Sequence, residues 1–164
     1  VRTTLTNQGT LTSSGGSVID TRNAVSAIIT NTGTISSTVT SNENILIGSN
    51  TVFTNEADGT LTSATDGLSL ASGNEFKNYG SLNVADNGTA IDITGNNNTI
   101  RLYDGSSIFG TISAGSSTTG NLLSVDTTDG QTVSETITGA IALTKLGTGT
   151  FDITGTKSYT APQP

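Results

Sequence analysis

The residues of this chain that could carry out bond-breaking chemistry are acidic. Carboxylate pairs hydrolyse glycosidic bonds when one acts as a general acid and the other as a base or nucleophile. The candidates are Asp66, Asp86, Asp92 and Asp104. Asp66 and Asp92 are separated by little more than one repeat of the chain, so on adjacent repeats they could stack and share a proton. The simpler interpretation, which we favour, is that they are hydrated acids on a polar face.

The residue types that are missing restrict the chemistry further. The chain has no His and no Cys, so neither a Ser-His dyad nor a His-based metal site can be built. Asp126, Asp129 and Gly130 superficially suggest calcium, but the segment lacks the ligands of a calcium-binding loop. We therefore expect a non-enzymatic protein that has no catalytic residues, no cofactor and no metal site.

Two cations and two tyrosines form the candidate binding site. Lys77 and Arg101 are separated by the same interval as Tyr79 and Tyr103, which is the length of one repeat. On adjacent repeats the rings could stack a sugar while the cations bind hydroxyls or an acidic substituent. The alternative is that the two rings pack on each other at a corner while the cations balance Glu75, Glu56 or Asp104.

These residues are positioned by a segment that recurs at almost constant spacing. Four copies begin at an apolar residue, and a degenerate fifth copy follows at the same interval. The leading apolar positions are Leu5, Ile29, Phe53, Phe76 and Ile100, followed within the first four copies by Leu11, Ile35, Leu61 and Leu82. A fixed period in the range of about 20–50 residues is typical of stacked-repeat proteins.

Within each repeat the pattern is that of short strands. Alternating apolar pairs such as Ile45 and Ile47, or Leu68 and Leu70, are followed by Gly or Asn turns. Asparagines recur at Asn7, Asn31, Asn55 and Asn78, where stacked side chains can hydrogen-bond from copy to copy. The sequence predicts an all-β, parallel β-solenoid with coils of about 23–24 residues. A leucine-rich repeat would need a helical half that is missing here.

Composition agrees with this fold and limits the partners. Thr, Ser, Asn and Gly make up more than half of the 164 residues, whereas charged residues are 12%. A net charge of −7 and a pI near 4.1 repel phosphate, so we expect neither nucleic acid nor anionic membrane as a partner. No apolar run approaches the length of a membrane span. We also expect the chain, which starts at Val1 without a signal peptide, to be a piece of a longer protein.

The repeat becomes less regular after about residue 105. A segment beginning at Ile108 has a counterpart beginning at Ile137, with the polar insert 115–120 between them, and this interval exceeds that of the earlier repeats. We therefore expect wider coils toward the C-terminus, or a protruding loop. Residues 1–160 are predicted to form a single β-helix and residues 161–164, which contain two prolines, a linker or truncated end.

Residues 139–160 resemble the passenger-associated repeat of bacterial autotransporters. The resemblance is carried by Lys145, Gly147 and Gly149, by the alternating apolar residues Phe151 and Ile153, and by an aromatic residue and a threonine near the end of the segment. It implies a right-handed parallel β-helix, secreted through type V secretion and displayed at, or released from, the outer membrane of a Gram-negative cell. The chain departs from the family by lacking the C-terminal barrel.

We expect a secreted or surface-exposed, extracellular passenger fragment with a role in cell adhesion and virulence. It would act as an adhesin or as a self-associating stalk whose partner is a surface protein or glycan of a host cell or bacterium. The alternative is a β-helical carbohydrate-active enzyme or tailspike-like depolymerase. A further alternative is an ice-binding β-solenoid, from the threonine rungs Thr10-x-Thr12, Thr34-x-Ser36, Thr60-x-Thr62, Ser81-x-Asn83 and Thr111-x-Ser113.

Overall fold

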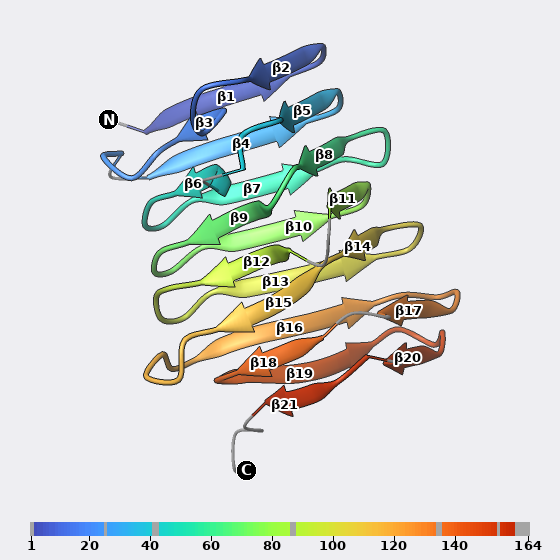
Figure 1. The fold of residues 1–164 in the computed structure, drawn as a ribbon. Coiled ribbons are helices and arrows are strands. Elements are labelled where there is room, and N and C mark those ends of the chain that lie inside the picture. The colour runs from blue at the N-terminus through green and yellow to red at the C-terminus, as the bar shows by residue number, and fades with distance from the viewer. Residues whose placement is uncertain are drawn as a thin grey trace.

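The chain winds into a β-solenoid of about six turns, made only of short strands and turns among the residues described (Figure 1). The computed structural model describes residues 2–24, 26–40, 43–85, 88–133, 136–153 and 155–159, with the backbone alone at 43, 131–133 and 159. Every strand pairing described is parallel, and each pairing joins a strand to its counterpart in a neighbouring coil. The predicted β-solenoid is confirmed, and a right-handed winding is the one expected of parallel β-connections.

Three sheets form the faces of the solenoid, which we call faces A, B and C. Face A consists of β1 (Thr3–Asn7), β4 (Ala27–Asn31), β7 (Val52–Asn55), β10 (Glu75–Asn78), β13 (Thr99–Tyr103), β16 (Asn121–Asp126) and β19 (Ile141–Leu146). Face B consists of β2 (Thr10–Ser13), β5 (Thr34–Ser37), β8 (Thr60–Ser63), β11 (Ser81–Val84) and β14 (Ser107–Phe109). Face C consists of β3 (Ile19–Asp20), β6 (Glu43–Ile47), β9 (Asp66–Leu70), β12 (Thr89–Ile93), β15 (Thr111–Ala114), β18 (Ile137–Gly139) and β21 (Lys157–Tyr159). Two further strands, β17 (Gln131–Val133) and β20 (Phe151–Ile153), form a separate two-stranded sheet.

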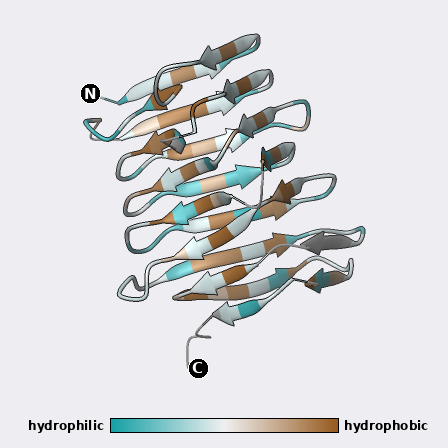
Figure 2. Ribbon diagram, in the orientation of Figure 1, coloured by the Kyte–Doolittle hydropathy of each residue, from teal (hydrophilic) through white to brown (hydrophobic). Residues whose placement is uncertain are grey.

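Alternation of side chains along each strand produces a narrow apolar interior. Ile29, Phe53, Phe76 and Ile100 occupy successive face-A rungs and are at most 1% exposed. Leu5, at the head of the same ladder, is only half-buried. Figure 2 shows the resulting bands of hydrophobic residues, which recur at similar positions from strand to strand. The predicted inward ladders are confirmed on faces A and B, and the pairs that begin at Ile45 form the ladder on face C.

The coils do not widen steadily toward the C-terminus, contrary to the prediction from the sequence. On face C, Ile112 pairs with Ile137, a long step along the chain that includes the polar insert 115–120. The following coil is instead the shortest of those described. Its length is set by the pairing of Leu123 with Leu143 on face A and of Ile137 with Lys157 on face C. The prediction of wider coils toward the C-terminus was therefore wrong beyond one step.

The prediction that the segments beginning at Ile108 and Ile137 are equivalent parts of successive coils was also wrong. Ile108 pairs with Leu82 on face B, whereas Ile137 pairs with Ile112 on face C. Gly110, with a φ of 123°, separates β14 from β15 and sends the chain around a corner between them. Residues 161–164 lie outside the described residues, so their predicted role as a linker stays a prediction.

Candidate functional site

The four residues predicted to bind a ligand come together on the outer surface of face A. Parallel pairing of β10 with β13 places Lys77 beside Arg101. The rings of Tyr79 and Tyr103 lie parallel, with centroids 4.1 Å apart and planes inclined by 6°. The equal spacing of the two pairs in the sequence was thus a sufficient signal for their contact.

Both cations are paired to the same carboxylate. Arg101 Nε donates to Glu75 Oε1 at 2.8 Å, and Lys77 Nζ lies 3.2 Å from Glu75 Oε2. The tyrosines pack face to face, so each ring has only one face that a sugar could cover. The alternative interpretation from the sequence, in which the rings pack together and the cations balance an acid, describes these contacts.

Electrostatics at this cluster follow from the shared acid. Partial burial acts to raise the pKa of Glu75, but hydrogen bonds from Arg101 and Lys77 outweigh it and hold the pKa below its ordinary value of 4.5. The same contact raises the pKa of Arg101. Burial, followed by the Tyr103 hydroxyl, raises the pKa of Tyr79.

The depressed pKa of Glu75 predicts a component of acid-induced destabilisation. The ionised carboxylate stabilises the fold fully above the unfolded-state pKa, and this contribution is lost as the pH falls through the lower folded-state pKa. In Glu75→Gln the loss of stability between about pH 5 and pH 3 should be smaller than in the wild type. Urea denaturation at several pH values measures it, and parallel pH profiles for the two proteins would contradict it.

The aspartates considered for catalysis are separated by the topology. Asp66 Oδ1 accepts a hydrogen bond from the Thr89 backbone nitrogen at 3.2 Å, whereas Asp92 pairs with Ser69 and Ser113, so the two do not stack. Asp104 lies at the corner after β13 and accepts hydrogen bonds from Thr128 and Asp129 of the next coil, which hold its pKa below the ordinary value. Asp86 lies outside the described residues. Among the described residues, no group of three or more acidic side chains is arranged to hold a metal.

The predicted asparagine ladder, hydrogen-bonded from copy to copy, is present, and it is buried. Each Asn side chain donates to the amide oxygen of the next, at 2.7 Å from Asn7 to Asn31, 2.8 Å from Asn31 to Asn55 and 2.9 Å from Asn55 to Asn78. The same amide groups also donate to backbone carbonyls in the adjacent turns. The ladder ends where Leu102 takes the next position. Its role is structural, because the hydrogen-bonding groups of the amides are already used between successive rungs and with the backbone.

A second asparagine ladder was missed in the sequence. Asn74, Asn98 and Asn121 are buried, and each amide oxygen accepts from the backbone nitrogen of the preceding rung, at Thr51, Asn74 and Asn98 respectively. Its members recur at the same interval as those of the first ladder, so the signal was present. The ladder was hidden because these residues lie among many other Asn and Gly in turns.

Lys145 and Gly147, which belong to the segment 139–160, build a corner of the final coil. The Lys145 ammonium donates to the backbone carbonyls of Thr127, Leu146 and Gly147. Gly147 has a φ of +69°, and an added Cβ would lie only 2.3 Å from the Thr127 carbonyl oxygen. This corner therefore requires Gly at 147 and places a cation beside converging carbonyls.

Threonine rungs line the outer surface of face B over three coils. Thr10, Thr34 and Thr60 form one column, and Thr12, Ser36 and Thr62 form its neighbour. The fourth rung is Ser81 and Asn83, and the fifth is Ser107 and Phe109. The predicted fifth rung, Thr111 and Ser113, was wrong, because β15 belongs to face C.

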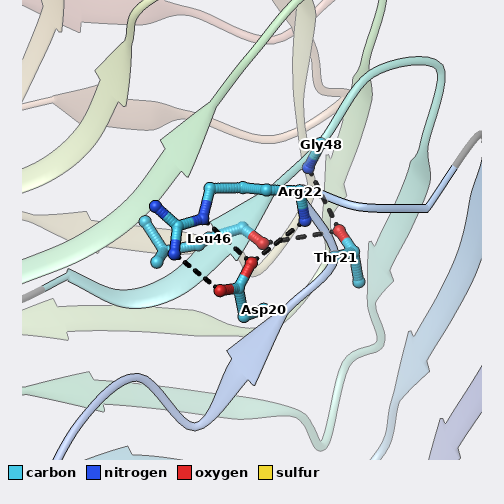
Figure 3. Close-up of polar contacts among 5 residues, drawn as sticks. All are labelled: Asp20, Thr21, Arg22, Leu46 and Gly48. Atoms are coloured by element: carbon cyan, nitrogen blue, oxygen red, sulfur yellow. Dashed lines mark hydrogen bonds and ion pairs between the residues drawn. The ribbon is translucent and has the colours of Figure 1, made fainter.

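One further ion pair lies at the corner after β3. Figure 3 shows Arg22 binding Asp20, with Nε 3.0 Å from Oδ1 and Nη2 2.7 Å from Oδ2. Between them Thr21 bridges two coils, accepting from the Gly48 nitrogen and donating to the Leu46 carbonyl. The pair is exposed, so it contributes little to stability and orders the corner locally.

Comparison of the chain with family models, with curated proteins and with solved structures gives no match. No helix among the described residues is long and apolar enough to cross a membrane.

Proposed function

We propose that this chain is a non-enzymatic, surface-displayed β-solenoid fragment of an autotransporter-like passenger, acting as an adhesive stalk that self-associates through face B. The observation that carries the proposal is the absence of charge in the strands of that face. None of β2, β5, β8, β11 and β14 contains an acidic or basic residue, although the chain has 13 acidic and 6 basic residues. Two copies, each of net charge −7, repel one another least where their contacting strands are uncharged.

The chemistry of face B suits contact with an identical face. Its outward side chains are mostly hydroxyls and methyls of Thr and Ser, which hydrogen-bond and pack without the cost of burying a charge. Face A and face C instead present groups such as Glu75, Arg101 and Asp92. Extracellular display on a Gram-negative cell belongs to the same proposal and is supported by the resemblance of residues 139–160.

The expected contact is weak for a single pair of chains. Five strands of three or four residues, about 4.8 Å apart, cover roughly 300 Å², well below the ~800 Å² per partner of a stable complex. Many copies displayed on one cell would add their contacts, because neighbouring molecules act at high effective concentration. This is the behaviour of an adhesive stalk.

Lysines placed on face B should abolish self-association. Bacteria displaying the chain should settle rapidly, and Thr34→Lys with Thr60→Lys should keep them dispersed, because the ammonium groups would be buried between copies. Settling rate and sedimentation velocity of the concentrated protein are the measurements. The matched control is Thr30→Lys with Thr54→Lys on face A, which should settle like the wild type. Equal effects of the two pairs, or no settling of wild-type cells, would overturn the role of face B.

A further inference from the structure

An aromatic ring, a carboxylate and an exposed leucine occupy three successive rungs at the edge of face A. Tyr103 pairs with Asp126, and Asp126 pairs with Leu146. All three alternate with inward residues and therefore project from the outer surface. Adjacent rungs are about 4.8 Å apart, so the short Asp126 side chain lies between two longer side chains. We call this column of Tyr103, Asp126 and Leu146 the notch, with Asp126 as its floor and the two longer side chains as its walls.

The two walls of the notch, Tyr103 and Leu146, each have a surface that a ligand could contact. One face of the Tyr103 ring is covered by Tyr79, and the other is turned toward the rung of Asp126. Leu146 is 41% exposed, one of the two large apolar side chains that are exposed in the described part of the chain. The notch thus has an aromatic wall and an aliphatic wall.

The carboxylate on the floor is not neutralised by the cations around it. The charge of Asp126 acts on Arg101 through space, but the ion pair of Arg101 is with Glu75. Lys77 is paired with the same carboxylate. Lys145 is directed to the carbonyls of Thr127, Leu146 and Gly147. Among the described residues, Asp126 has no hydrogen bond or ion pair through its side chain, so its charge remains open to an external cation.

We propose that Tyr103, Asp126 and Leu146 bind an arginine side chain of a partner protein. A planar guanidinium can stack on the tyrosine face while it pairs with the carboxylate, and the arginine methylenes can cover Leu146. Lysine fits less well because its compact ammonium cannot stack. This site lies on face A and is independent of the self-association proposed for face B.

A second acid lies beside the other tyrosine of the stacked pair, and it can be compared with Asp126. The backbone nitrogens of Thr32, Glu56 and Tyr79 donate to corresponding carbonyls on successive rungs, so these three residues are aligned in the same way. There the acid lies between a tyrosine and a polar threonine. Two features therefore distinguish the ends: the apolar Leu146 in place of a threonine, and the shorter Asp126 in place of Glu56.

The test is a titration of the ¹⁵N-labelled chain with a blocked Gly-Arg-Gly peptide at physiological salt. Amide shifts should concentrate at Tyr103, Asp126 and Leu146, and Asp126→Asn should weaken binding at least about fivefold. Glu56→Gln should change the affinity less than about twofold. A peptide with neutral citrulline in place of arginine should not bind, and one with lysine should bind more weakly.

Several outcomes would overturn the site. Equal weakening by Asp126→Asn and Glu56→Gln would mean that net negative charge alone attracts the peptide. Binding of the citrulline peptide, or equal binding of the lysine peptide, would contradict the stacked guanidinium. The dispersion of each variant's spectrum shows that it is folded, so a loss of binding can be assigned to the notch.

Discussion

Replacing Phe76 by alanine should lower the free energy of unfolding by about 3–5 kcal/mol. Phe76 is fully buried, and its ring centroid is 5.3 Å from that of Phe53 on the adjacent rung. The interior is narrow, so few other side chains can move into the space that the ring leaves. The loss should appear as a lower denaturation midpoint in urea, followed by circular dichroism.

A matched variant separates burial from aromatic character. Phe109 is 52% exposed at the end of face B, so Phe109→Ala should change stability by no more than about 0.5 kcal/mol. An unchanged midpoint for Phe76→Ala would show that the register of face A is wrong. A loss as large for Phe109→Ala would show that this side chain is buried in solution.

The repeat made most of the fold predictable from the sequence. Because side chains alternate along a strand, Leu5, Ile29, Phe53 and Phe76 could be assigned to the interior once their spacing was known. The same spacing brought Asn7, Asn31, Asn55 and Asn78 into one ladder. These are local rules repeated in each coil, so an error in one coil does not affect the next.

Coil length was less predictable because turns can lengthen or shorten without altering the alternation within strands. The segments beginning at Ile108 and Ile137 have similar patterns, yet they lie on different faces. What separates them is the corner at Gly110, and a glycine at this point looks the same in the sequence as a glycine in any other turn.

At the candidate site, adjacency was predictable, and the acid that pairs with the cations was narrowed to Glu75, Glu56 or Asp104 without a choice among them. The interval of one repeat placed Tyr79 beside Tyr103 and Lys77 beside Arg101. The choice of Glu75 as the shared acid depends on a long Arg101 side chain reaching diagonally between rungs. The notch at Asp126 was missed because its leucine wall belongs to the final, shorter coil, whose register the sequence did not reveal.

Replacing Asn55 by leucine should destabilise the chain by about 3 kcal/mol or more, although leucine is apolar and similar in size. The Asn55 amide group donates to the Gly59 and Ser81 carbonyls and to Asn78 Oδ1, and its own oxygen accepts from Asn31. The site is completely buried, so water cannot replace these partners. Urea denaturation measures the loss.

The end of the same ladder supplies the control. Asn78 is also fully buried, but the next rung already carries Leu102, so the change Asn78→Leu extends an apolar stretch that the wild-type chain tolerates. It removes the donor to the Ser107 carbonyl and one acceptor of Asn55, while Asn55 keeps its two backbone acceptors. We therefore expect a smaller loss than for Asn55→Leu. If Asn78→Leu is equally or more destabilising, the ladder does not act as a continuous chain whose interior members matter most, and each asparagine serves only its own turn.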